Sequence, residues 1–224
     1  MRIQVGDPSI DWFALQPQSD RKHVVVVEDG RPRMAGTSTE EISLVDDEGQ
    51  PALRRTQTLA SAELGSRRTE TVVFRDGFFP CRHLDVTPAW TVAVAYRGTK
   101  ILGEKRLTRG EAMPIETEVE APIFDYHSVE MVLRVLPLRE GLDAELRVFH
   151  AVRGVCMTVT IEVLGLETVT ISDQATAAWH VQTDWNGHVR QSYWISEKTR
   201  ELLKQLSSPT EHLQLQLIRG YSQI

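Results

Sequence analysis

Only one stretch of the sequence, residues 122–149, carries a helical pattern. Its apolar residues recur at spacings of three and four, which places them on one helical face: Tyr126, Val129, Leu133 and Leu136. Asp125 is a natural N-cap, because its carboxylate can accept a hydrogen bond from a free N–H group of the first turn. Pro137 lacks the N–H group that would continue the helix. We therefore predict one helix over residues 125–136, then a turn at Gly141 and a strand.

The rest of the chain has the pattern of strands and turns. In residues 155–163, apolar side chains occupy every second position, as in a strand with one buried face. Strands are predicted at 23–28, 33–45, 52–60, 69–75, 78–86, 90–96, 99–107, 115–120, 143–150, 155–164, 166–171, 176–184, 188–196, 200–206 and 211–218. Many strands joined by short turns favour a mostly β protein with one main helix, in which a single antiparallel sheet curls into an open or nearly closed barrel.

No change in composition marks a linker, so we expect residues 1–224 to form a single β-rich domain. Residues 1–20 are expected to be an irregular lead-in. The helix at 125–136 has to bury its apolar face, and the concave side of the curled sheet is the available surface. The helix is therefore predicted to pack on that side of the sheet.

Charge and composition exclude several classes of protein. The net charge is −6 and the 25 Lys and Arg residues are scattered, whereas a nucleic-acid surface needs a basic stripe. No window approaches the roughly 20 apolar residues of a transmembrane helix. The start has no apolar signal segment, so the chain is expected to be cytoplasmic as given, and periplasmic or exported if it is truncated. Cys81 and Cys156 are far apart and are expected to be reduced thiols.

A hairpin around Asn186-Gly187 carries the row of residues that most resembles a site. Both residues tolerate the positive φ of a two-residue turn, and that turn would pair Trp179 with Trp194. One face of the hairpin would then carry Trp179, Val181, Trp185, Ser192 and Trp194, and the other His180, Gln182, Gln191 and Tyr193. This second row is either a polar ligand-contact strip inside the curved sheet or a solvated outer face.

The start of the helix adds three candidate binding residues. Asp125 is the cap. His127 either lines the mouth of a cavity or is solvated, and we expect His127 to be solvated. Arg134 is either a buried anion anchor or a surface residue with a buried stem. The sequence indicates no catalytic residue, metal site or cofactor: His188 would lie on the opposite face from His180 and Asp184, and no common catalytic motif is present.

Several short segments resemble a bacterial family of β-rich proteins of unknown function, of the kind compared with the LolA/LolB lipoprotein carriers. They are Phe124-Asp125, residues 133–138 with Gly141, 165–169, 179–181, 193–195 and 199–203, and the resemblance covers about residues 68–206. It implies a sheet curled around a helix as an unclosed barrel, with an apolar interior able to hold a lipid-like chain. The sequence departs from the LolA/LolB pattern by lacking a signal peptide and a lipobox cysteine.

We carry three hypotheses about function. The first is a non-catalytic protein that binds an apolar or amphipathic small molecule or lipid in its curved sheet. The second is a protein–protein interaction or assembly module. The third is a cofactor-free enzyme that uses His127, His180 and Tyr193 as acid/base groups, which requires at least two of them close together around a pocket. The sequence leaves the oligomeric state open.

Overall fold

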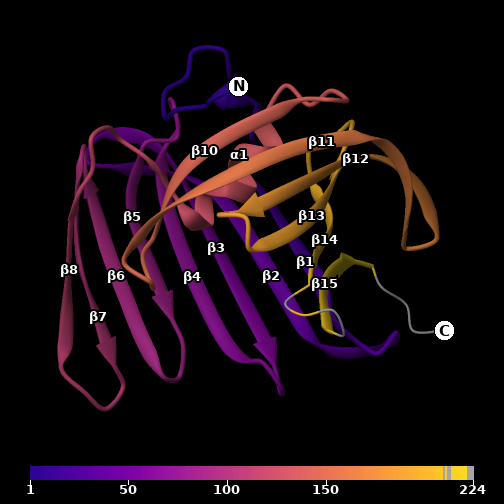
Figure 1. Cartoon of the computed structure of the whole chain (residues 1–224), viewed down its shortest axis with the longest axis horizontal. Coiled ribbons are helices and arrows are strands. Elements are labelled where there is room, and N and C mark those ends of the chain that lie inside the picture. Colours follow the sequence, from indigo (N-terminus) through magenta and orange to yellow (C-terminus); the bar gives the residue numbers. More distant parts are fainter. Residues whose placement is uncertain (209, 211–212, 221–224) are drawn as a thin grey trace.

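A computed structural model describes residues 1–208, 210 and 213–220. Its strands form one 15-stranded sheet, in the order β8-β7-β6-β5-β4-β3-β2-β1-β15-β14-β13-β12-β11-β10-β9. Figure 1 shows this sheet curling around α1, and in the strand order β8 and β9 are its two unpaired edges. The predicted class, a mostly β protein with one curled sheet that does not close, is therefore confirmed.

The first half of the sheet is a meander of antiparallel hairpins. A 3₁₀ turn, η1 (Trp12–Ala14), precedes it. The strands are β1 (Gln18–Glu28), β2 (Arg31–Asp47), β3 (Gln50–Ser61), β4 (Gly65–Phe74), β5 (Pro80–Val86), β6 (Trp90–Arg97), β7 (Lys100–Leu107) and β8 (Ala112–Glu118). The predicted lead-in ends three residues early, because β1 starts at Gln18 and pairs with β2 from its first residue.

The helical segment follows a two-residue strand, β9 (Phe124–Asp125), that pairs in parallel with β10. It begins as a 3₁₀ turn, η2 (Tyr126–Ser128), and continues as α1 (Val129–Val135). The predicted cap is present, since the Asp125 side chain accepts a hydrogen bond from the His127 N–H group. The predicted end is also correct, because Leu136 is extended and precedes Pro137. Among the described helices, none is long and apolar enough to cross a membrane.

The second half is another antiparallel meander, and its last strand pairs with the first strand of the chain. The strands are β10 (Asp143–His150), β11 (Val155–Ile171), β12 (Gln174–Trp185), β13 (Val189–Ser196), β14 (Leu202–Ser207) and β15 (Leu213–Arg219). The two strands predicted at 155–164 and 166–171 are one, because a bulge at Gly165 lets the chain continue without a turn. Positions 211 and 212 of the last predicted strand lie outside the described residues.

The interior next to α1 is packed with side chains. Leu133 of α1 is fully buried, and it belongs to a large apolar cluster that joins Leu53 of β3 to Val159 of β11. A second cluster, which includes Val92 and Tyr96 of β6, lies beside the first. Because α1 contributes to the cluster that spans both halves of the sheet, it fills the part of the interior in which it lies.

The predicted register of the β12–β13 hairpin is wrong by one residue. His180, not Trp179, pairs with Trp194, and Trp185 pairs with Val189. The loop therefore has three residues, Asn186 to His188, although Asn186 and Gly187 do have the positive φ angles of 53° and 73° that were expected. A one-residue slip moves every side chain of one strand to the other face relative to its partner. The predicted rows of side chains are accordingly divided between the two faces.

Candidate functional site

Polar side chains cross the interior of the sheet below α1. Alternate residues of a strand share one face, so each strand from β1 to β5 points one or two polar groups inward beside its apolar ones. These groups meet others from η2 and α1, and most of them are buried. We call this set the polar belt: Lys22, Glu40, Arg55, Thr71, His83, Asp85, Asp125, His127, Glu130 and Arg134.

Glu40 is the centre of an ion cluster that ties α1 to the sheet. Its carboxylate accepts hydrogen bonds from Arg134 Nη2 at 2.6 Å and from Arg55 Nε at 2.8 Å. Arg55 also pairs with Glu130 of α1. Burial raises the pKa of Glu40, but Arg134 and Arg55 outweigh it, so the pKa lies well below its ordinary value. The cluster is therefore ionised, and Arg134 is a buried partner of Glu40 rather than a surface residue.

Asp125 links the start of the helix to the opposite wall of the barrel. One carboxylate oxygen caps His127 at 2.8 Å, and the other accepts a hydrogen bond from the Tyr96 hydroxyl at 2.5 Å. The Ser128 hydroxyl donates to the Asp125 backbone oxygen at 2.7 Å. Burial and the adjacent carboxylate raise the pKa of Tyr96 well above its usual range. The edge strand β9 is thus held against β6 by a buried hydrogen bond.

His127 lies inside the barrel, so the expectation that it is solvated is wrong. Its side chain is 11% exposed, and its ring stacks on that of His83 with centroids 4.5 Å apart. Its Nε2 atom is 3.8 Å from an Asp85 carboxylate oxygen and 3.3 Å from Arg67 Nη2. Burial lowers the pKa of His127 well below its ordinary value, and His83 and Arg67 lower it further. The imidazole is therefore neutral.

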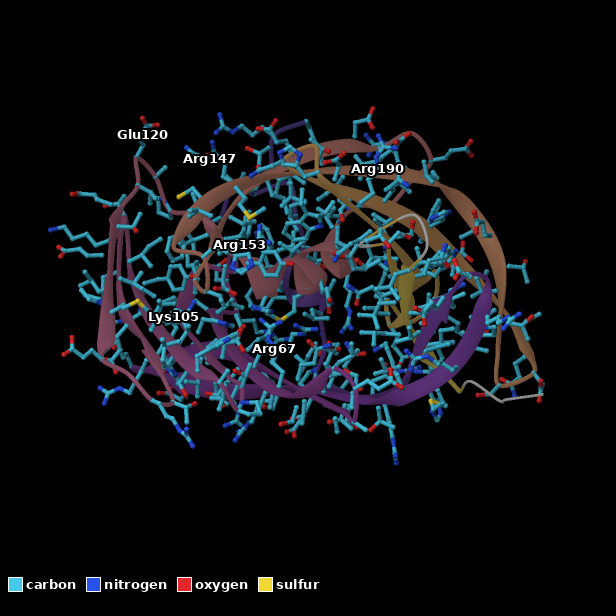
Figure 2. All side chains as sticks on the ribbon, turned by 60° about the horizontal axis from the view of Figure 1, so that its bottom comes forward. Arg67, Lys105, Glu120, Arg147, Arg153 and Arg190 are labelled. Carbon is cyan, nitrogen blue, oxygen red and sulfur yellow. The ribbon has the colours of Figure 1, made fainter. Side chains whose placement is uncertain are left out.

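Three cations gather where the start of β6 and the end of β7 meet the β10–β11 turn. Figure 2 shows Arg67, Lys105 and Arg153 pointing into the space inside the curled sheet, whereas Arg147 and Arg190 lie on its outer side. We call these three residues, with the Trp90 ring that two of them approach, the cationic cluster: Arg67, Lys105, Arg153 and Trp90. Lys105 Nζ is 5.7 Å and Arg67 Cζ is 5.9 Å from the centre of the Trp90 ring.

The cationic cluster has an excess of positive charge. Arg67 pairs with Asp85, and Lys105 donates to the Val152 carbonyl oxygen at 3.4 Å. Within the described part of the chain, neither Lys105 nor Arg153 forms an ion pair with a carboxylate. The pKa of the neighbouring His150 is lowered to about 4, mainly by burial and further by the positive charge of Arg153. An anion would be stabilised at this position.

The residues predicted as a polar strip do not form one. His180 and Gln182 lie on the outer face of the sheet, where His180 Nδ1 is 2.8 Å from a Glu167 carboxylate oxygen. Tyr193 is 1% exposed and faces the interior, where its hydroxyl donates to the Gln191 amide oxygen. His180 is therefore on the opposite face from Tyr193 and His127, so the acid/base set of His127, His180 and Tyr193 is not brought together as a whole.

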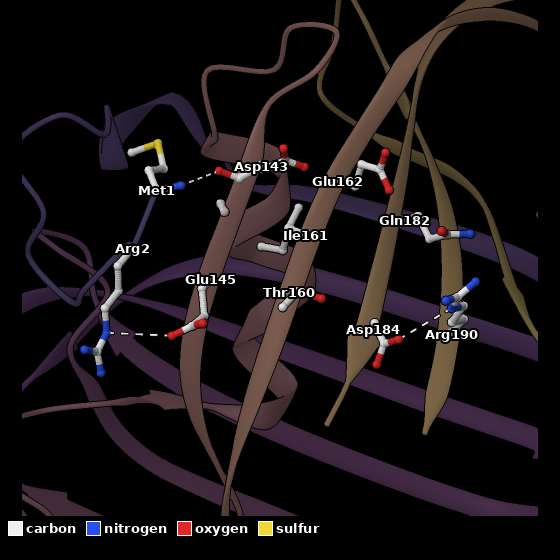
Figure 3. Close-up of a pocket in the computed structure, with 11 residues that line it drawn as sticks. Met1, Arg2, Asp143, Glu145, Thr160, Ile161, Glu162, Gln182, Asp184 and Arg190 are labelled. Carbon is white, nitrogen blue, oxygen red and sulfur yellow. Dashed lines mark hydrogen bonds and ion pairs between the residues drawn. The ribbon is translucent and has the colours of Figure 1, made fainter. Parts of the chain in front are cut away.

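The outer face carries a wide polar groove of about 750 Å³. Figure 3 shows its lining side chains on β10, β11, β12 and β13, with the helix behind the strands. Gln182 lines it, and four carboxylates outnumber its two arginines: Asp143, Glu145, Glu162 and Asp184, against Arg2 and Arg190. Two of these carboxylates are already paired, Glu145 with Arg2 and Asp184 with Arg190. Apart from these two ion pairs, the charged side chains that line the groove do not meet as a cluster.

Sequence reasoning named Asp125, His127 and Arg134 as candidate binding residues, and the structure places all three in the polar belt, but their partners from the sheet were missed. Glu40 and Arg134 are 94 positions apart, so no local spacing joins them. One signal in the sequence could have revealed Glu40 as a buried charge. Glu40 lies two positions before Ile42, which is almost fully buried, so both side chains point to the same face of β2. Both cysteines are free thiols, as expected, and Cys81 is buried.

The curled sheet, the enclosed helix and the polar belt define a β-barrel-like protein with charged groups inside it. Residues 29–210 match the family described as "Protein of unknown function (DUF3108)", and the chain belongs to this family. No curated protein matches the chain. The expectation of a β-rich family of unknown function is thus confirmed, and the finer likeness to LolA/LolB carriers stays a prediction.

The chain is similar to several solved structures, including the following two. The crystal structure of a β-barrel-like protein of the DUF1849 family from Brucella abortus is 10% identical, with 92% of this chain and 97% of that chain covered and a TM-score of 0.56. A putative exported protein with a YmcC-like fold from Bacteroides fragilis is 11% identical over the same shares, and its TM-score of 0.39 is too low to carry an argument. The first likeness shows the fold alone.

Proposed function

We propose that the cationic cluster binds the anionic head group of an amphipathic small molecule, and that the protein carries out no chemistry on it. The observation that carries this proposal is the excess of positive charge around one partly buried indole. In a protein of net charge −6, the half-buried Lys105 and the exposed Arg153 of the β10–β11 turn have no carboxylate partner among the described residues. An unpaired cation beside an aromatic ring is a common way to hold a carboxylate or phosphate.

The surroundings of the cationic cluster suit an apolar tail as well as a charged head. Trp90, Ile115 and Val152 are partly buried and pack against the second apolar cluster. A short acyl chain laid over these residues would cover apolar surface, at about 25 cal/mol per Å² removed from water. Because α1 fills the neighbouring part of the interior, the proposed position is beside the helix and not beneath it.

Isothermal titration calorimetry with sodium laurate, below its micelle concentration, tests the proposal. Wild-type protein is expected to bind laurate, and Lys105→Gln or Arg153→Gln to weaken binding at least tenfold, because a hydrogen bond to a charged group contributes about 1.5–3 kcal/mol. Acetate and 1-dodecanol separate the head from the tail. Each should bind more weakly than laurate if both parts contribute.

Matched controls come from the outer face. Arg147→Gln and Arg190→Gln remove the same charge as Arg153→Gln but lie away from the cationic cluster (Figure 2), so they should leave the laurate affinity within twofold. If wild-type protein does not bind laurate, or if the two outer variants weaken it as much as the inner ones, the proposal is wrong.

A further inference from the structure

Three residues of the types that ligate transition metals meet inside the barrel. His83 and Asp85 are two positions apart on β5, so both side chains point to the interior face. His127 comes from η2 and stacks on His83. One ligand atom from each residue lies within 4.8 Å of the other two. Two imidazoles and a carboxylate form a set that binds Zn²⁺ and similar divalent ions.

His83 supplies a second observation that points to a missing partner. The residue is 1% exposed, and its Nδ1 atom is 2.9 Å from the Thr71 hydroxyl oxygen. Its Nε2 atom is buried and has no hydrogen-bond partner. Metal-binding histidines commonly use one ring nitrogen for the ion and hold the other with a hydrogen bond. Thr71 fixes the ring of His83 in this way and leaves Nε2 for a ligand.

Arg67 occupies the place that a metal ion would take beside Asp85. Its Nε atom donates to Asp85 at 2.9 Å, and its Nη2 atom lies between Asp85 and His127. Asp85 is fully buried, so it needs a positive partner at all times. The side chain of Arg67 is 36% exposed and can turn outward when another cation replaces it.

We propose that His83, Asp85 and His127 form a binding site for a divalent transition metal, and that Arg67 takes the place of the ion when it is absent. Ligand atoms around a four-coordinate Zn²⁺ are about 3.4 Å apart, since the bonds are about 2.1 Å long. His127 Nε2 and the Asp85 oxygen are already 3.8 Å apart, and the widest gap among the three atoms, at most 4.8 Å, must close by up to about 1.4 Å. The two stacked imidazoles are parallel within 5°, so at least one ring has to turn toward the ion. The site then keeps one position open on the side that Arg67 leaves.

Calorimetric titration of the full chain with Zn²⁺ tests this inference. Wild-type protein is expected to bind one equivalent, and His83→Gln, Asp85→Asn and His127→Gln to weaken binding at least tenfold each. Arg67→Gln should tighten binding at least fivefold, because the ion no longer competes with the guanidinium for Asp85. A purely structural role for these residues predicts no such gain.

Two further measurements keep the inference open to refutation. His180→Gln removes a histidine that pairs with Glu167 on the outer face and should leave Zn²⁺ binding unchanged. If the ligand variants do not fold, wild-type protein with Co²⁺ should still show the visible absorption bands of a low-coordinate site. The inference is overturned if wild-type protein binds no Zn²⁺, if His180→Gln abolishes binding, if Arg67→Gln fails to tighten it, or if those Co²⁺ bands are absent. Arg67 belongs to both the cationic cluster and the metal site, but Lys105 and Arg153 do not ligate the ion, so Lys105→Gln and Arg153→Gln should leave Zn²⁺ binding unchanged and separate the two proposals.

Discussion

Removing Arg134 or Glu40 should destabilise the protein far more than removing a surface ion pair, and the two losses should not add. Arg134 is 2% exposed, and its ion partner is Glu40, which it contacts at 2.6 Å. In Arg134→Met, Glu40 keeps Arg55 as a partner, and two unpartnered Arg134 nitrogens are removed as well. We therefore expect a loss near the lower end of the range for broken buried pairs, about 3 kcal/mol.

Glu40→Gln should cost more, about 4–5 kcal/mol, because Arg134 then has no carboxylate and Arg55 keeps only Glu130. In the double variant, Arg55 and Glu130 still form a neutral pair. The double loss should therefore fall short of the sum of the single losses by about 2 kcal/mol or more.

Urea unfolding at pH 7, followed by tryptophan fluorescence, measures these free energies, and an unchanged m-value shows that the folded state is intact. Arg97→Met is the matched control, because Arg97 contacts Glu48 at 3.0 Å with both side chains more than half exposed. This variant should leave the free energy of unfolding nearly unchanged. Additivity within about 0.5 kcal/mol, or an Arg134→Met variant as silent as the control, would refute the reasoning.

Three smaller predictions concern the sheet. Gly36→Ala should cost at least about 2 kcal/mol, because its Cβ would lie 2.1 Å from the Ala60 backbone oxygen, whereas Gly110→Ala should be nearly neutral in the same urea assay. Asp20→Asn should destabilise the pairing of β1 with β15, since Asp20 bonds Lys22 and Arg219. Burial raises the pKa of Asp20, but these cations lower it below 3.8 overall, so the wild-type advantage should be present above pH 4 and vanish as the pH falls further. Iodoacetamide at pH 8.5 should alkylate Cys156 first, as judged by mass spectrometry, because burial raises the pKa of Cys81 to about 12.

Much of the sheet could be predicted because its signals are local. Alternating apolar residues and turn residues located the strands, and Asp125 and Pro137 bounded the helix. The register of the β12–β13 hairpin failed because Asn186 and Gly187 have the same positive φ angles in a loop of three residues as in a turn of two. Loop length cannot be decided from these two residues alone.

The site could be predicted only in part, because its contacts join distant segments. Asp125 was identified as a cap from its position, yet its bond to Tyr96 depends on the sheet curling until β9 reaches β6. His127 follows a capping residue, where side chains are commonly solvated, and only the curled sheet buries it. His83 and Asp85 share one face of β5, but His127 is 42 positions beyond Asp85 and only the curled sheet brings it to them.

The most direct test of the proposed binding function compares two double variants by calorimetry with laurate. Lys105→Gln/Arg153→Gln removes both unpaired cations of the cationic cluster, and Arg147→Gln/Arg190→Gln removes two from the outer face at the same cost in net charge. We predict that the first weakens laurate binding at least about a hundredfold and the second by less than threefold. Equal losses in the two variants, or none in either, would contradict the proposal that these cations hold the head group.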